Sequence, residues 1–223
     1  KLEKAGLIRT ELLPGSRGSQ KVCSAIYDRL VVDLAGPDKV PDADNSVSIH
    51  MPIGNFVDCE VTPTCGLLSD SGIIGLLDDP ASFYEPERTQ AQLLWFRKGY
   101  VEYRFPNKTP SDSVVQSLEL TMEVCSEAPL HKPQWPSDIT LWVNGTEVGT
   151  WLSPGDFGGE RGMLTPEWWG TDSTQFGLLK KWRINGNGTY IDGESLSPVT
   201  LEQCNLNEKS YFTIRLGVKE DAD

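Results

Sequence analysis

The chain has 223 residues, of which 20 are Lys or Arg and 32 are Asp or Glu, so its formal net charge at pH 7 is −12. A chain of this length can bury a hydrophobic core without metal or disulfide cross-links. The 38% hydrophobic content and the absence of an apolar run near ~20 residues exclude a disordered chain and a membrane-spanning helix. The acidic balance excludes a protein that coats nucleic acid over its whole surface.

Charge is unevenly distributed along the chain. The first 29 residues carry six basic and three acidic side chains, a net +3, so the remainder carries −15. Between the two parts, residues 36–38 and 41–45 combine turn-forming residues with few apolar anchors. We therefore expect a basic module over residues 1–34, a linker over residues 35–45 and an acidic domain over residues 46–223.

The basic module has a readable order of elements. Residues 1–6 are typical of the last turn of a helix, with Gly6 in the left-handed cap position. Residues 7–11 predict a strand, residues 14–19 a flexible turn, and residues 20–26 a returning strand. The expected order is therefore helix end, strand, basic tip, strand.

This order, with the Lys-Leu-Glu-Lys-Ala-Gly-Leu-Ile stretch of residues 1–8, resembles the winged-helix transcription regulators of the bacterial ArsR type. In that family the recognition helix closes with such a stretch, and a β-hairpin wing follows. The resemblance covers residues 1–34 and implies a cytoplasmic, homodimeric DNA-binding protein, of which this chain lacks most of the DNA-reading helix. The wing would contact DNA phosphates through Arg9, Arg17 and Lys21, which adds affinity with little sequence information. The alternative is an ordinary exposed hairpin with solvated charges.

The acidic domain shows the period-2 alternation of half-buried strands almost throughout. Residues 115–125 and 211–218 alternate apolar and polar side chains, and residues 138–151 predict a hairpin whose turn is Asn144-Gly145. Residues 85–94 are left open between helix and strand. Further strands are expected at residues 56–61, 92–97, 100–105, 176–184 and 189–192. The expected fold class is mainly β: a β-sandwich or jelly-roll-like domain, preceded by the β-hairpin of a partial winged-helix wing.

The acidic domain also resembles a known domain. Its segments 59–66, 91–96, 100–107 and 153–162 are similar to the C-terminal β-rich domain of a subgroup of bacterial ArsR-type regulators. The resemblance implies an effector-sensing or regulatory role and specifies no ligand. The family pattern continues beyond residue 221, so the chain is expected to be short at both ends.

A glycine-rich loop followed by paired tryptophans, over residues 153–169, is the strongest candidate binding site. Glycine lets the backbone approach a ligand closely, and indoles offer flat faces to a sugar, so the loop suits a neutral polyol or glycan. The alternative is that Asp156 and Arg161 anchor the loop while the indoles close one end of the sandwich. The candidate ligand-binding residues are Asp156, Glu160, Arg161, Glu167, Trp168 and Trp169. With seven tryptophans in the chain, a carbohydrate-binding module is the rival function.

Enzymatic and metal chemistry receive little support. Neither His50 nor His131 lies in a recognisable triad context, so no catalytic residue is assigned and no enzyme is predicted. Cys59 and Cys65 lack a second closely spaced ligand pair, so we expect no metal and no cofactor. The odd, scattered set of five cysteines indicates a reducing compartment. A glycosidase would need two carboxylates across a cleft, and its candidates would be Glu87, Glu102, Asp156 and Glu167.

Overall fold

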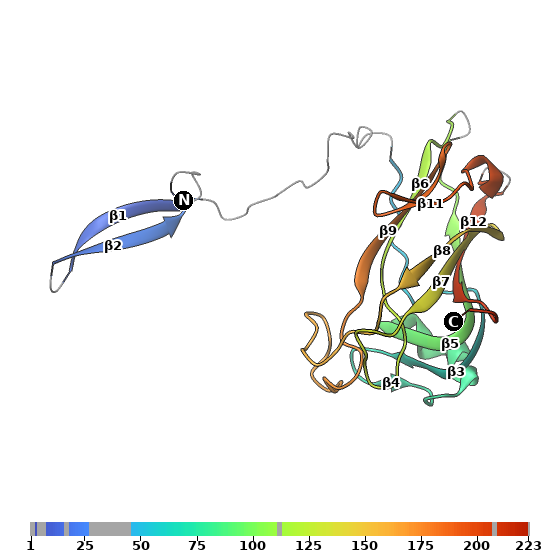
Figure 1. Ribbon diagram of the computed structural model, residues 1–223, viewed down its shortest axis with the longest axis horizontal. Coiled ribbons are helices and arrows are strands. Elements are labelled where there is room, and N and C mark those ends of the chain that lie inside the picture. Colours follow the sequence, from blue (N-terminus) through green and yellow to red (C-terminus); the bar gives the residue numbers. More distant parts are fainter. Residues whose placement is uncertain are drawn as a thin grey trace. The chain divides into compact units, whose positions relative to one another are not determined.

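The computed structural model describes residues 3, 8–15, 18–26, 46–110, 113–206 and 209–222 (Figure 1). The chain divides into two compact units, Lys1–Ser46 and Val47–Asp223. The expected linker over residues 35–45 lies outside the described residues, as does the expected helix end apart from Glu3, which lies in a turn.

The first unit contains a β-hairpin. Strands β1 (Ile8–Gly15) and β2 (Gly18–Ala25) are antiparallel, with a register that runs from Ile8 opposite Ala25 to Gly15 opposite Gly18. The two predicted strands are confirmed, but both extend further towards the tip than expected. Among the described residues, β1 and β2 pair only with each other and form a sheet of their own.

The described residues of the second unit form two antiparallel sheets, which confirms the mainly-β expectation (Figure 1). One sheet consists of β3 (Asp58–Leu68), β4 (Ile73–Ile74), β5 (Leu93–Pro106), β7 (Ser137–Val143), β8 (Thr146–Ser153) and β12 (Tyr211–Val218), in the order β4-β3-β5-β12-β7-β8. The other consists of β6 (Ser117–Val124), β9 (Leu178–Asn185), β10 (Gly188–Ile191) and β11 (Glu194–Ser197), in the order β11-β10-β9-β6. The described residues of this unit also form the short 3₁₀ helices η2 (Pro80–Tyr84), η3 (Pro86–Gln90) and η4 (Glu202–Cys204).

The hydrophobic core lies on one face of the six-stranded sheet. Between the two sheets, Leu141, Val143 and Ile214 pack against Trp182 and Ile184 of the four-stranded sheet. Further along the same sheet a second cluster is closed by η2, which contributes the fully buried Phe83. The four-stranded sheet therefore covers part of this face of the six-stranded sheet, and the segment that contains η2 covers another part.

The long strand β5 corrects one prediction. Two strands were expected here, at residues 92–97 and 100–105, but β5 is continuous. Gly99 makes this possible, because it adopts φ +109° and pairs with Val61 next to an irregularity in β3. A Cβ atom on Gly99 would lie 1.8 Å from the carbonyl oxygen of Glu60. Only glycine fits this position.

We therefore expect Gly99→Ala to destabilise the protein severely, by about 3 kcal/mol or more, because a backbone clash adds to the ~1–2 kcal/mol cost of positive φ. Gly193 is a matched control, since it also has positive φ (+91°) but has nothing within 4 Å of an added Cβ atom. Gly193→Ala should cost only about 1 kcal/mol. Urea unfolding of both variants measures the difference, and equal losses would contradict this account of β5.

Candidate functional site

The glycine-rich loop joins β8 to β9 and is closed by its own hydrogen bonds. The backbone N–H of Gly159 donates to the carbonyl oxygen of Thr171 at 2.7 Å, and the N–H of Gln175 donates to that of Phe157 at 2.7 Å. The rings of Phe157 and Phe176 stack with their centroids 5.8 Å apart. The loop is thus a compact, internally bonded structure.

Asp156 anchors this loop from inside. Its side chain is fully buried, and Oδ2 accepts hydrogen bonds from the backbone N–H of Ala128 (3.0 Å) and the hydroxyl of Thr174 (2.9 Å). Its backbone N–H donates to the carbonyl oxygen of Lys132 at 2.8 Å. Burial raises the pKa of the Asp156 carboxyl above its ordinary value, and Oδ1 has no hydrogen-bond partner among the described residues. Asp156 therefore contacts protein on every side rather than solvent.

Arg161 fixes the segment that carries the tryptophans. Its guanidinium donates to the carbonyl oxygens of Pro166 (2.7 Å), Trp169 (3.1 Å) and Glu167 (3.3 Å). The donors of this side chain are thus turned towards the loop itself. The neighbouring Glu160 is exposed, as is Glu167. These two carboxylates are the candidate residues of the loop that face solvent without serving as anchors.

The two adjacent indoles have different roles. The Nε1 of Trp169 donates to the carbonyl oxygen of Thr174 at 2.8 Å, and its ring lies 6.2 Å from that of Trp95. Because side chains alternate along a strand, Trp95 lies on the face of β5 opposite to Phe96, so Trp169 covers the face that the core leaves free. Trp168 is 41% exposed, and its Nε1 donates to the carbonyl oxygen of Asp70 at 2.7 Å. Trp168 is therefore the indole with surface available to a ligand, and it links the loop to the turn between β3 and β4.

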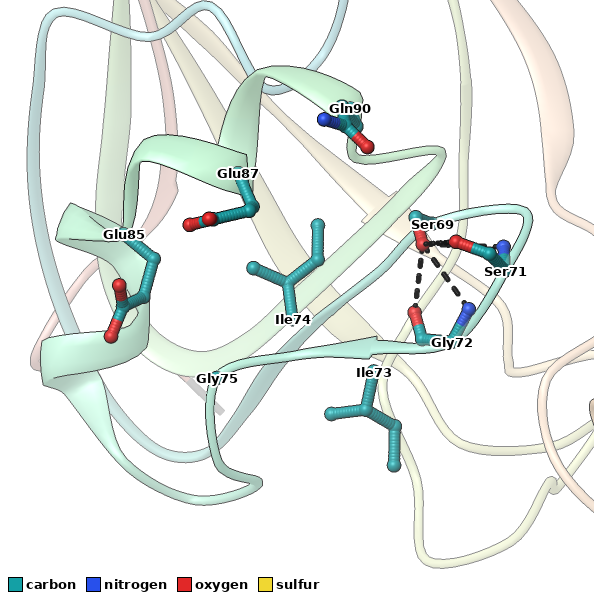
Figure 2. Close-up of a pocket in the computed structure, with 9 residues that line it drawn as sticks. All are labelled: Ser69, Ser71, Gly72, Ile73, Ile74, Gly75, Glu85, Glu87 and Gln90. Atoms are coloured by element: carbon teal, nitrogen blue, oxygen red, sulfur yellow. Dashed lines mark hydrogen bonds between the residues drawn. The ribbon is translucent and has the colours of Figure 1, made fainter.

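A pocket that the sequence did not indicate lies next to this turn (Figure 2). It has a volume of about 310 Å³ and lies between the turn with β4 on one side and the η2–η3 segment on the other. Its polar side chains come from serine, glutamate and glutamine. The lining residues are Ser69, Ser71, Gly72, Ile73, Ile74, Gly75, Glu85, Glu87 and Gln90.

The four carboxylates considered for glycosidase chemistry have separate environments. Glu87 borders the pocket, and Glu102 lies on β5 with Oε2 2.9 Å from Nε of Arg215. Asp156 is enclosed by the glycine-rich loop, and Glu167 is exposed on its surface. Among the described residues, no two of these four carboxylates share a hydrogen-bond partner.

The cysteines do not form a pair. Cys59 and Cys65 lie six positions apart on β3, which corresponds to roughly 20 Å along an extended strand, far beyond the Cα separation of a disulfide. Burial raises the pKa of Cys65 to about 11, so its thiol stays protonated at neutral pH. The described residues contain no group of three or more His, Cys, Asp and Glu side chains that could hold a metal ion.

The basic side chains of the hairpin are exposed on both of its faces. Arg9 lies opposite Ser24 and Lys21 opposite Leu12, so the alternation of the strands places Arg9 and Lys21 on opposite faces. A nitrogen of Arg9 lies 3.1 Å from Oε1 of Glu11, and Nζ of Lys21 lies 3.7 Å from Oε2 of Glu3. Arg17, the third expected phosphate contact, lies outside the described residues.

Comparison with protein-family models, with curated proteins and with solved structures finds no match for this chain. None of the helices in the described part of the chain has the length and apolar character needed to cross a membrane.

Proposed function

We propose that this chain is part of a cytoplasmic bacterial DNA-binding transcription regulator of the ArsR type, without enzymatic activity. In this proposal the β1–β2 hairpin is the wing that contacts DNA phosphates, and the β-sandwich is an effector-sensing or oligomerisation domain of a homodimer. The observation that carries the proposal is the hairpin itself: β1 and β2 pair with each other and expose Arg9 and Lys21, in a basic segment of an otherwise acidic chain.

Electrostatics supports the hairpin as the contact surface. The chain outside residues 1–29 carries a net charge of −15 and repels the phosphate backbone, so attraction to DNA is confined to the basic segment. Basic side chains on opposite faces suit a ribbon whose tip enters a groove, because a groove has a phosphate backbone on each side. The ion pairs of Arg9 with Glu11 and of Lys21 with Glu3 are exposed, and such pairs contribute only about 0–1 kcal/mol, so phosphate oxygens can replace the carboxylates.

Regulation would follow from linkage. A ligand that binds one arrangement of the sandwich domain more tightly than another shifts the population towards that arrangement. If the two arrangements hold the two wings of the dimer differently, the ligand changes the affinity for DNA by its differential binding energy.

The proposal predicts that removing the two described cations of the hairpin weakens binding to duplex DNA. Fluorescence anisotropy with a labelled duplex, measured over a series of salt concentrations, is the test. Each phosphate contact contributes about 0.9 to the slope of log K against log salt, so Arg9→Gln/Lys21→Gln should lower the slope by about 2 and weaken binding at every salt concentration.

The control variant is Lys108→Gln/Lys219→Gln, which removes the same charge from the acidic domain and should leave the slope unchanged. Equal effects of the two double variants, or no binding of the unmodified chain at low salt, would refute the wing. Binding of soluble oligosaccharides that depends on Trp168, without binding of DNA, would replace the regulator by the carbohydrate-binding module that the exposed indole of Trp168 favours as second candidate.

A further inference from the structure

The pocket of Figure 2 has one wall that is fixed by the turn between β3 and β4. The backbone N–H and the hydroxyl of Ser69 both donate to the carbonyl oxygen of Gly72, at 2.8 and 3.0 Å, and the N–H of Gly72 donates back to the hydroxyl at 3.2 Å. Ser69 is itself buried, and its hydroxyl also lies 3.1 Å from that of Ser71. This wall is therefore held in one conformation without a ligand.

The opposite wall is formed by the η2–η3 segment, which is also well defined. Each 3₁₀ helix begins with proline, whose fixed φ is suited to the first helical position, and Oδ1 of Asp79 accepts from the N–H of Ala81 at 2.9 Å. Between the walls, Ile74 is only 6% exposed and provides an apolar floor. Figure 2 shows Ile74 between Glu87 and the turn, whereas Ile73 points the other way.

The polar side chains on the η2–η3 wall of this cavity are available to a ligand. The side chains of Glu85, Glu87 and Gln90 are exposed, and within the described part of the chain they make no hydrogen bond or ion pair. Arg88 is the only cation in residues 69–92, and it is turned away from them. Its guanidinium donates to the carbonyl oxygens of Gly54 (2.6 Å) and Phe56 (2.8 Å) and lies 4.4 Å from the centre of the Phe56 ring. Among the described residues, no ion pair therefore compensates the negative charge of the two glutamates.

Two neighbouring carboxylates do not by themselves make a site. Here they border a cavity whose size is at the lower end of the range for small-molecule sites, with a buried apolar floor and serine and glutamine side chains in its lining. We propose that this pocket binds a small organic cation, such as a diamine or a guanidinium compound. Its methylene groups would pack on Ile74, and its charged nitrogens would donate to Glu85 and Glu87. Binding stands independently of the DNA contact, whereas a role of the cation as effector rests on the proposed function.

A bare metal ion fits the pocket less well. A calcium ion takes 6–8 oxygen ligands, usually with several carboxylates among them. Two carboxylate side chains line this cavity, those of Glu85 and Glu87. An organic cation needs negative charge and hydrogen-bond acceptors on one side and apolar contact on the other. Glu85 and Glu87 supply the charge and the acceptors, and Ile74 supplies the apolar contact, so the lining favours an amine.

Isothermal titration calorimetry with putrescine, which has amines at both ends of a four-carbon chain, tests this proposal. The neutral counterpart is 1,4-butanediol, which has the same chain with hydroxyls in place of amines. We expect putrescine to bind, 1,4-butanediol to give no heat above dilution, and Glu85→Gln/Glu87→Gln to weaken putrescine binding at least tenfold. Both glutamates are exposed, so this variant should keep the unfolding midpoint of the unmodified protein.

The matched control is Glu194→Gln/Glu202→Gln, which removes two exposed carboxylates elsewhere and should change putrescine affinity less than twofold. Three results would overturn the proposal: equal weakening in both double variants, which indicates general attraction to an acidic chain; binding of 1,4-butanediol as tight as that of putrescine; or displacement of putrescine by calcium chloride through Glu85 and Glu87. None of these results affects the DNA experiment, so the two proposals can fail separately.

Discussion

Replacing Trp182 by alanine is expected to lower the free energy of unfolding by about 4 kcal/mol, because it removes the largest fully buried side chain from between the two sheets. Trp182 lies on β9, packs in the main core cluster and meets the ring of Trp151 edge to face at 6.3 Å. The space between two hydrogen-bonded sheets cannot collapse around the missing indole. Most of the cavity should therefore persist.

The conservative variant separates packing from hydrogen bonding. The indole nitrogen of Trp182 is buried and has no hydrogen-bond partner among the described residues, so Trp182→Phe loses volume but no bond. We expect it to cost about 1–2 kcal/mol. Trp135→Ala is the control at an exposed tryptophan and should cost less than about 1 kcal/mol. A loss for Trp182→Ala that is no larger than that for Trp135→Ala, measured by urea unfolding, would contradict the assigned core.

Replacing Asp156 by leucine is expected to lower the free energy of unfolding by about 2–4 kcal/mol. The change leaves two donors, the buried N–H of Ala128 and the half-buried hydroxyl of Thr174, without an acceptor, and each such loss costs up to about 1–3 kcal/mol. Asp156→Asn keeps an acceptor oxygen for both donors and replaces an ionisable buried group by a neutral one. Its stability at pH 7 should stay within about 1 kcal/mol of the unmodified protein.

The raised pKa of Asp156 also predicts that the stability of the protein depends on pH, which Asp156→Asn tests. Burial raises the pKa of Asp156 in the folded state, so the folded protein holds this proton at pH values where the unfolded chain has released it. The unfolding free energy contributed by Asp156 is therefore largest at acidic pH and is lost as pH rises through the folded pKa. The hydrogen bonds from Thr174 and Ala128, and to a smaller extent His131, partly offset this rise in the pKa of Asp156. Burial also raises the pKa of Glu127. Asp156→Asn should thus reduce this decline without abolishing it, and an unchanged profile would show that Asp156 is not the group responsible.

Alternation predicted the strands that have one face on the core. Residues 115–125, 138–151 and 211–218 all show a clean period of two and correspond to β6, the β7–β8 hairpin and β12. The Asn144-Gly145 turn was also correct, and both residues have positive φ (49° and 81°). These signals are local, so the sequence alone could carry them.

The features that could not be predicted depend on contacts between distant segments. At Gly99 a glycine looked like the end of a strand, but its pairing with β3 keeps β5 continuous. The pocket was missed because its walls, residues 69–75 and 85–90, form no motif together and meet only in the folded chain. In the glycine-rich loop, Arg161 could equally have faced a ligand or the loop. Only the positions of three carbonyl oxygens show that it faces the loop.

Arg88 connects η3 to the stretch of chain that enters β3. Its guanidinium donates hydrogen bonds to the carbonyl oxygens of Gly54 and Phe56 and packs on the Phe56 ring, so the two segments are held together by three contacts of one side chain. A displacement of η3 would therefore also displace residues 54–56, because one side chain holds the two segments together.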